Sequence, residues 1–447
     1  MSDDSDTQRA PHHSDTAPRH YRGCRHRLAG WLLLAMGGLA VLHAASESFQ
    51  AWPAGACAWL TAALLWDRIS RTHRLLVGII TAFGCLALAV AWWRGGALPL
   101  AQAISQNHTL LTMLVAVTFL RLISLPSERS ATPLPTGHKA LWRTVLGVHL
   151  FGAVINISTV IIMADRITQT RPLDRTTALL FSRAFSACAF WSPFIGGTAL
   201  VLAYVDGSEL ATLMLVGLPL AACSVALTYW WSRGDADTFH GYPIRFASLW
   251  IPALLAISVL TVHKLVPDVS ILIVIAVIAT LLTVVVLFLK QGITRAAHAV
   301  RHHTEHQLPQ LAQELLLFLA AGVLATGVAE LIATTGDPFP FHTLNGATAS
   351  LTLGAMIVLA VAGIHPIIMV SVISIMVVPI SPDPNLAAMM FMMCWAIGVP
   401  ASPLSGTNLI LQGRYNVPSW KLSRWNLKYC LAMYAIAALT LHLYDAF

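Results

Sequence analysis

Two short motifs place residues that can bind a ligand inside otherwise apolar segments. The chain reads Ser-Pro-Phe-Ile-Gly-Gly-Thr from Ser192 and Ser-Pro-Leu-Ser-Gly-Thr-Asn from Ser402, so the two motifs lie 210 positions apart. Proline removes a backbone donor and glycine permits non-helical geometry, so each motif predicts a break in a helix. A break frees backbone amides and carbonyls beside polar side chains. The residues offered to a ligand are Gly196, Gly197 and Thr198 in the first motif, and Gly406, Thr407 and Asn408 in the second.

The composition places these motifs in a membrane. Hydrophobic residues make up 57% of the 447 and charged residues only 11%, whereas a soluble domain carries about 25% charged residues. Apolar runs of about 18 to 25 residues recur along the chain, each long enough to cross a bilayer core of about 30 Å. The fold class predicted is therefore an all-α polytopic membrane protein.

Other classes of function lack the residues that they need. The seven cysteines are scattered singly, with no zinc or redox spacing, and no phosphate-binding loop, dinucleotide fingerprint or zinc-protease motif occurs. A membrane-embedded enzyme, the remote alternative, would need converging catalytic groups, and only His365 is a candidate. We therefore expect no enzyme and no cofactor. The net charge of +7 fits basic cytoplasmic loops, and we expect no nucleic-acid partner.

Eleven apolar segments are predicted to span the bilayer, and two more are predicted to enter and leave it on one side. The segment 141–163 has arginine-rich loops on both sides, although such loops mark the cytoplasmic face, and the segment 348–380 is too long for one span. Both are therefore expected to be re-entrant hairpins, with polar tips buried in protein or lining a wet cavity. The tip residues are Asn156, Ser158 and Thr159 in the first, and His365 and Pro366 in the second. The predicted spans are 28–46, 49–66, 75–93, 105–124, 177–204, 210–231, 247–265, 269–289, 314–334, 385–411 and 426–444.

The two halves of the chain arrange these parts in the same order. Each has three spans, a hairpin, a broken helix and one more span. Because five spans and a hairpin make an odd number of crossings, the halves are expected to be inverted repeats, as in secondary transporters. The predicted N-terminus is cytoplasmic and the C-terminus periplasmic, in the inner (plasma) membrane. The predicted parts are a disordered tail at 1–27, an extra helix at 28–48, a first repeat at 49–232 with its broken helix at 177–204, a linker at 233–246, and a second repeat at 247–447 with its broken helix at 385–411.

These features resemble the ion transporter superfamily, most closely its divalent anion/sodium symporter (citrate-transporter-like) branch. Asn-Ile-Ser-Thr from Asn156 and Gly-Ile-His-Pro from Gly363 resemble the two hairpin tips, and Ile-Gly-Gly-Thr from Ile195 and Ser-Gly-Thr-Asn from Ser405 resemble the two breaks. The resemblance implies an elevator mechanism, a homodimer, and transport of a small anion such as a di- or tricarboxylate. The family's Ser-Asn-Thr triplet is absent, and His365 stands where Asn or Thr is usual, which leaves substrate and coupling ion open.

Half-helix amino termini favour an anion and freed carbonyls favour a sodium ion, so a transported Na⁺ near Thr198 and Asn408 and coupling to Na⁺ or H⁺ are both expectations. His365 can couple a proton, donate to a carboxylate, or be purely structural. Arg183 falls close to the end of a predicted span, where we expect its side chain to extend to the interface. The alternatives are a metalloid oxyanion exporter and a cation/proton antiporter. The antiporter usually needs an acidic residue at the middle of a span, and none is predicted there.

Overall fold

The computed structural model describes residues 23–46, 48–124, 133–244, 250–336 and 339–447. In these residues the secondary structure is helical throughout, with no strand and a single isolated bridge between Thr136 and His240. Nearly all of the predicted tail lies outside the described residues, although its last four residues already belong to the first helix, which begins at Cys24.

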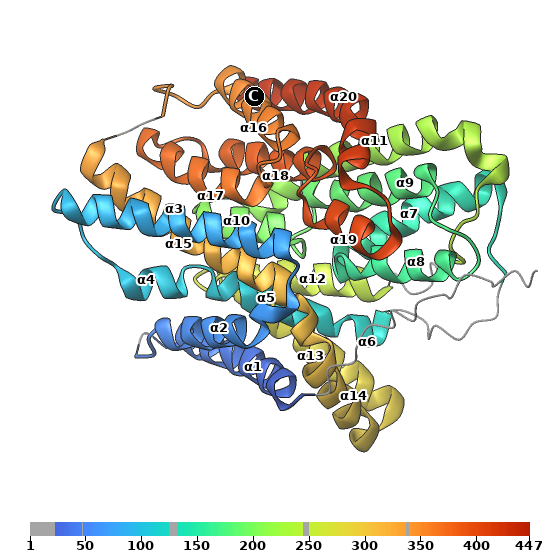
Figure 1. The fold of residues 1–447 in the computed structure, drawn as a ribbon, viewed down its shortest axis with the longest axis horizontal. Coiled ribbons are helices and arrows are strands. Elements are labelled where there is room, and N and C mark those ends of the chain that lie inside the picture. Colours follow the sequence, from blue (N-terminus) through green and yellow to red (C-terminus); the bar gives the residue numbers. More distant parts are fainter. Residues whose placement is uncertain (1–22, 47, 125–132, 245–249, 337–338) are drawn as a thin grey trace, which may run out of the picture.

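The helices follow one another as the apolar runs predict, with short connections (Figure 1). Up to residue 238 they are α1 (Cys24–Ala45), α2 (Trp52–Leu65), η1 (Trp66–Arg68), α3 (Arg71–Trp93), α4 (Leu100–Ser105), α5 (His108–Phe119), α6 (Arg121–Ser124), α7 (Gly137–Ile155), α8 (Ser158–Thr168), α9 (Arg175–Ser186), η2 (Ala187–Phe190), α10 (Gly196–Tyr204), α11 (Leu210–Ser232) and η3 (Arg233–Thr238). From residue 250 they are α12 (Trp250–Leu265), α13 (Ile271–Gln291), α14 (Ile293–His306), η5 (Leu308–Leu311), α15 (Ala312–Thr335), α16 (Gly346–Val361), α17 (Pro366–Val377), η6 (Val378–Ile380), α18 (Pro384–Ala401), α19 (Gly406–Tyr415) and α20 (Ser419–Ala446).

Eight stretches of helix among the described residues are long and apolar enough to cross a membrane, and they coincide with eight of the eleven predicted spans. The other three are shorter or interrupted. The predicted span 49–66 is the 14-residue α2, and 247–265 is the 16-residue α12. The span 177–204 is divided between α9 and α10, because the helix ends before the first Ser-Pro motif.

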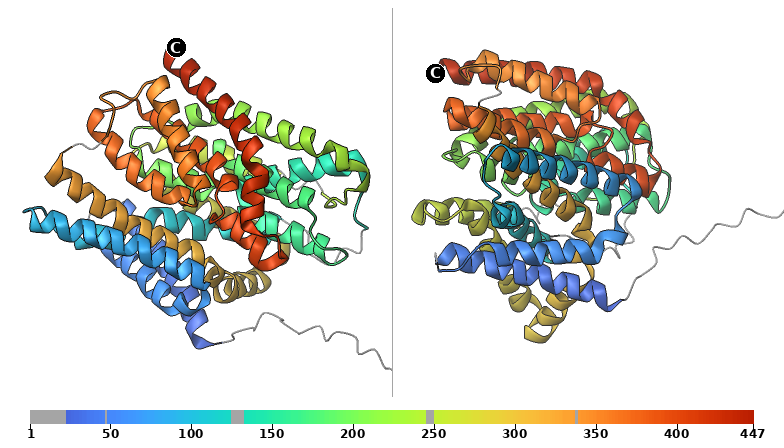
Figure 2. Two further views of the ribbon diagram at one scale, coloured as in Figure 1. Left: turned by 45° about the horizontal axis from the view of Figure 1, so that its top comes forward. Right: turned by 60° about the vertical axis from the view of Figure 1, so that its left-hand side comes forward.

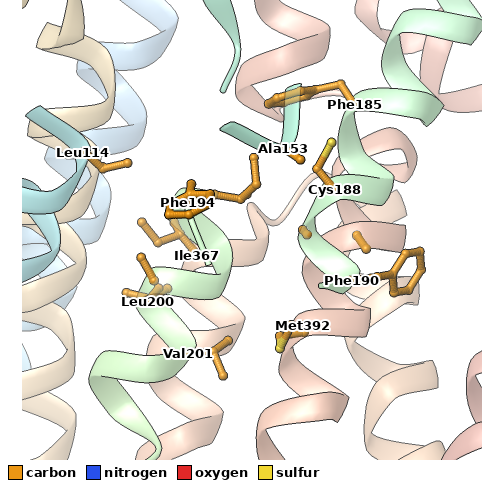
Figure 3. Packing of buried hydrophobic residues seen from close by; sticks show 14 of the residues in the cluster. Leu114, Ala153, Phe185, Cys188, Phe190, Phe194, Leu200, Val201, Ile367 and Met392 are labelled. Atoms are coloured by element: carbon orange, nitrogen blue, oxygen red, sulfur yellow. The ribbon is translucent and has the colours of Figure 1, made fainter. Parts of the chain in front are cut away.

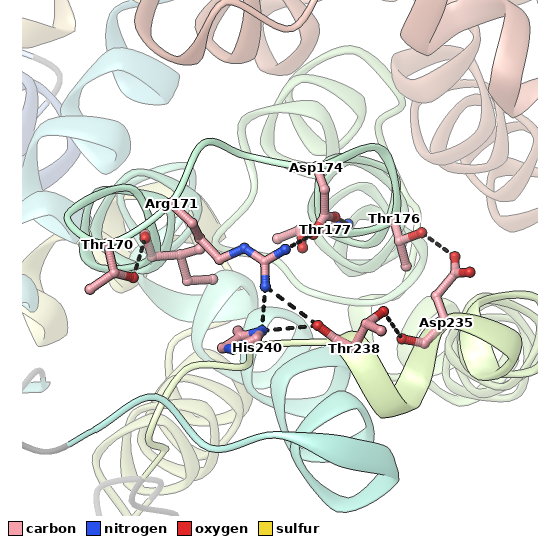
Figure 4. Close-up of polar contacts among 9 residues, drawn as sticks. Thr170, Arg171, Asp174, Thr176, Thr177, Asp235, Thr238 and His240 are labelled. Carbon is pink, nitrogen blue, oxygen red and sulfur yellow. Dashed lines mark hydrogen bonds and ion pairs between the residues drawn. The ribbon is translucent and has the colours of Figure 1, made fainter.

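The segment predicted as the first hairpin forms the helix pair α7 and α8, which a two-residue turn joins. Asn156 occupies this turn with φ +59°, a left-handed conformation that asparagine tolerates better than most residues. The outer ends of the pair meet at one place, since Thr136, just before α7, pairs with His240, and Arg171, just after α8, also bonds His240 (Figure 4). The pair therefore leaves the helical bundle on the side on which it enters.

The second predicted hairpin forms α16 and α17, joined by residues 362–365. Gly363 has φ +103° in this connection, a conformation for which glycine is the natural residue. In Figure 1, α7, α8 and α9 fill the right of the molecule, whereas α17, α10, α3 and α15 fill the left. The two turned views agree with this separation of the two helix pairs (Figure 2).

Buried apolar side chains fill the space between the hairpins and the broken helices. Figure 3 shows Phe194, which is 2% exposed and lies just before α10, beside Ile367, with Leu114 and Ala153 on neighbouring helices. These last three side chains belong to α17, α5 and α7. The packing therefore holds the first break against both hairpins.

Candidate functional site

The two helix breaks have the same hydrogen-bond pattern although their sequences differ. The backbone N–H groups of Ser192 and Ser402 each close the preceding helix with a 2.8 Å bond to the carbonyl four residues earlier. Each serine Oγ then accepts a 3.3 Å bond from the N–H two residues later, which belongs to Phe194 or Leu404. The pattern keeps the 210-residue offset between the Ser-Pro motifs.

Thr198 and Asn408 occupy equivalent positions in the two breaks. Thr198 Oγ1 donates to the carbonyl of Ala189 at 3.3 Å, and Asn408 Nδ2 lies 3.4 Å from the carbonyl of Val399, in each case nine positions back. Asn408 Nδ2 also donates to the carbonyl of Ser402 at 2.9 Å. Both side chains are fully buried. In this structure they bridge the two halves of each broken helix.

A cavity of about 130 Å³ lies where four helices begin. Its wall includes the first residue of α8, Ser158, and the first residue of α10, Gly196. It also includes His365, which is the N-cap of α17, and the first two residues of α19, Gly406 and Thr407. A helix amino terminus carries partial positive charge, so four of them at one cavity create a site suited to an anion, although side chains cap the N–H of Ile367 in α17 and that of Asn408 in α19.

The predicted site residues divide between the cavity wall and the packing behind it. The residues on the wall are Asn156, Ser158, Gly196, His365, Gly406 and Thr407. Thr159, Gly197, Thr198, Pro366 and Asn408 are not among the lining residues. The expectation that Thr198 and Asn408 share this cavity therefore needs correction, because their polar atoms are turned to backbone carbonyls. Thr159 Oγ1 is buried with no hydrogen-bond partner among the described residues.

His365 has a defined hydrogen-bonding role at the second tip. Its Nδ1 accepts a 3.1 Å bond from the N–H of Ile367 and so caps α17. The neutral ring must then carry its proton on Nε2, which remains able to donate to a ligand in the cavity. A second proton on Nδ1 would abolish the cap. This geometry favours hydrogen-bond donation over proton coupling among the roles open to His365.

Aromatic rings close one part of the cavity. Phe318 and Trp395 stack with centroids 6.4 Å apart, and the imidazole of His365 meets Trp395 edge-on at 6.0 Å. A Cβ added at Gly197 would lie 2.2 Å from the Trp395 ring, so the second glycine of the first motif makes room for this indole. Periodicity in the sequence does not reveal this contact, because Trp395 lies almost 200 positions from Gly197.

Glu314 and His73 also line the cavity and were missed from the sequence. Glu314 belongs to the first turn of α15. The sequence places it at the edge of the predicted span 314–334, where an acidic residue is usual. No acidic residue was predicted at the middle of a span, and Glu314 lies at a span edge, but the cavity reaches the first turn of α15 and so includes its carboxylate.

Arg183 differs from the prediction as well. It is 5% exposed and its Nε donates to Asn426 Oδ1 at 2.7 Å. Its guanidinium also lies over the rings of Trp231 and Tyr429. The side chain packs inward because α11 and α20 cover this face of α9. Arg183 is linked to the second break by a chain of hydrogen bonds. Asn426 Nδ2 donates to the Ser182 hydroxyl, and that hydroxyl donates to Asn408 Oδ1 at 3.1 Å.

Within the described ranges, no group of three or more His, Cys, Asp or Glu side chains could hold a metal ion.

No family model and no curated protein matches this chain. Among solved structures, it is similar to the YdaH transporter of Alcanivorax borkumensis, whose crystal structure reveals an unusual topology. The TM-score is 0.42 and the sequence identity 12%, over 82% of this chain and 85% of that chain. A likeness at this level assigns neither a family nor a substrate.

Proposed function

We propose that the protein is a secondary active transporter that moves a small anion, of the di- or tricarboxylate class, across the inner membrane by an elevator mechanism. Sodium or protons drive the movement, and the working unit is a homodimer. The observation that supports this proposal is the convergence of four helix amino termini on one cavity.

The helix ends on the cavity wall favour an anion over a cation, whereas the Glu314 carboxylate on the same wall opposes it. Each helix amino terminus is equivalent to roughly +0.5 elementary charge. No lysine or arginine belongs to the described part of the wall, so the helix ends and His365 are the groups that would bind an anionic ligand. The first break has no side-chain cap on α10, which leaves amides there for ligand oxygens.

The helix pairs support an inverted-repeat topology. The ends of the α7–α8 pair are held together by His240, and Arg414 of α19 pairs with Asp165 of α8 at 2.9 Å. These contacts gather the loops at 133–136, 170–176 and 233–241 on one face, which we assign to the cytoplasm. A cysteine placed at Thr170 should react with a membrane-impermeant thiol reagent only from the cytoplasmic side. Reaction only from the periplasm would make 141–163 an ordinary span and remove the inverted repeat.

Uptake into proteoliposomes tests the proposed activity. Labelled succinate, citrate and arsenate are offered to the purified protein under an inward sodium gradient and an inward proton gradient in turn. Accumulation of a carboxylate under either gradient is the expected result. Accumulation of arsenate alone would instead support an oxyanion exporter, and absence of all anion movement would overturn the proposal.

The residue His365 gives a sharper test of the binding site. Asparagine is a good N-cap, so His365→Asn keeps an acceptor for the N–H of Ile367 and removes the Nε2 donor. A hydrogen bond to a charged group is worth about 1.5–3 kcal/mol, or roughly a ten- to hundredfold change in affinity. We expect the apparent KM to rise by about that factor with normal thermal stability. An unchanged KM would leave His365 with a capping role only.

A second candidate function is cation/proton antiport, which the carboxylate of Glu314 on the cavity wall favours. The four positive helix ends oppose it. The same proteoliposomes, loaded with a pH-sensitive dye, distinguish the two functions. Proton movement on addition of Na⁺ or K⁺ without an anion would support the antiporter.

A further inference from the structure

Glu314 brings a negative charge to a cavity whose helix amino termini carry partial positive charge. It lies in the first turn of α15, is half-buried, and belongs to the cavity wall together with His365, Gly196 and Thr407. Its carboxylate makes no ion pair or hydrogen bond with another described residue. The site suited to an anion therefore also contains an unpaired negative group.

An ionised Glu314 and an anionic ligand cannot occupy this space without cost. Two like charges repel more strongly in a protein cavity than in bulk water, and a half-buried carboxylate without a partner has already lost part of its hydration. Neutralising the carboxylate removes both costs. Because linkage is reciprocal, a group that must be neutral for the anion to bind is itself neutralised more readily when the anion is present.

We propose that Glu314 is the proton-coupling residue of the transporter, so that one proton bound to its carboxylate enters the cavity with each anion and leaves with it. This inference rests on the proposed transport of an anion. The proton is taken from water on the side of entry and returned to water on the side of release.

The charged and titratable groups around Glu314 are few. On α3, which packs along α15, His73 lines the cavity, and its Nε2 lies 2.9 Å from the carbonyl of Gln313. At the start of α17, which also packs on α15, the group is His365. Arg71 is exposed and Arg74 donates to the carbonyl of Ile69, and neither lines the cavity. Among the described residues of the wall, Glu314 is the single carboxylate.

A structural role is the competing explanation. An acidic residue in a first turn stabilises the helix dipole, and Glu314 holds such a position in α15. Glu314→Gln separates the two roles, because it keeps the shape and removes the charge that a proton would neutralise. Glu330→Gln is the matched control, since Glu330 lies on the same helix but not on the cavity wall.

The experiment uses the full chain in proteoliposomes with labelled succinate and citrate as probes. Two activities are measured, namely accumulation driven by an inward proton gradient and exchange with the same anion on both sides. For the wild type, linkage of one proton predicts that the apparent Kd falls roughly tenfold for each unit by which the pH is lowered, while Glu314 is ionised. For Glu314→Gln, we expect Kd to be independent of pH, exchange to persist, and accumulation to be lost. Glu330→Gln should behave as the wild type.

The outcomes separate this inference from the proposed function. Accumulation by Glu314→Gln equal to the wild type, or accumulation by the wild type that needs sodium and ignores the proton gradient, overturns the role of Glu314 alone. Absence of anion movement by the wild type in both activities removes the proposed function and this inference with it. If Glu314→Gln does not fold, the wild type is labelled with dicyclohexylcarbodiimide, which reacts with protonated carboxyl groups. This labelling then tests whether Glu314 binds a proton. Modification of Glu314 that slows as pH rises and abolishes accumulation is expected, and no modification at any pH contradicts the proposal.

Discussion

The two helix breaks share a backbone pattern, yet they differ in how firmly side chains tie them to the rest of the protein. At the first break, Thr198 makes one bond and the Ser192 hydroxyl donates to the carbonyl of Ala153 in α7, but no side chain caps α10. At the second break, Ser405 caps α19. Asn408 donates to backbone carbonyls and also accepts a bond from the Ser182 hydroxyl. The first break therefore keeps its amides available, whereas the second is fixed by a polar network.

This difference follows from the residue types. A threonine hydroxyl has one proton to donate, whereas the asparagine amide has two donors and an acceptor oxygen. Asn408 can therefore bridge its own broken helix and still accept from α9. Asn408, one of the predicted ligand-binding residues, therefore makes several internal hydrogen bonds in the structure.

The largest expected effect concerns this pair. Asn408→Leu removes partners from the Ser182 hydroxyl and the Ser402 carbonyl, and each buried group left unpaired costs about 1–3 kcal/mol. Thr198→Val removes one long bond, for a loss of about 0.5–1.5 kcal/mol. Thermal unfolding in detergent should therefore show a clearly greater loss for Asn408→Leu. Equal losses of stability for the two variants would mean that side-chain bonds stabilise the two breaks equally, which would contradict the difference described above.

A second test addresses packing at the first break. In Gly197→Ala the new Cβ would collide with the Trp395 indole, and such overpacking costs about 1–3 kcal/mol. Gly406→Ala is the control, because a Cβ there meets no atom within 4 Å. We expect a lowered melting temperature for Gly197→Ala only, with partial recovery when Trp395→Leu is added. A normal melting temperature for Gly197→Ala would show that the ring moves freely.

The smallest expected effect concerns the contact of the second broken helix with the first hairpin. Arg414 of α19 pairs with Asp165 of α8, and Tyr415 donates to the same carboxylate at 2.7 Å. Since the arginine and aspartate side chains are 53% and 37% exposed, the ion pair is worth about 0–1 kcal/mol. Asp165→Asn should leave the melting temperature nearly unchanged while altering the transport rate. A large loss of stability would instead make this contact as firm as the Asn408 network.

The sequence predicted those parts of the fold that local chemistry determines. Proline and glycine disfavour continuous helix, and the chain leaves helical geometry at both Ser-Pro-x-x-Gly motifs and turns at Asn156. Six of the residues predicted to bind a ligand lie on the cavity wall, and whether they bind one stays a prediction. Glu314 was not singled out and Arg183 was expected at the interface, because each lies near the end of an apolar run and only tertiary packing decides whether a side chain there turns outward or inward.

The contacts of His240 with Thr136 and Arg171 have a consequence for the order in which the parts of the protein come together. His240 lies 69 residues after Arg171, which it bonds at the outer end of α8. A ribosome adds about 5–20 residues per second, so roughly 3–14 s pass between synthesis of the two partners. During that interval α7 and α8 are already made but their ends are not yet joined. The outer ends of the first hairpin can therefore be joined only after α11 has been synthesised, when the second half of the chain is still to be made.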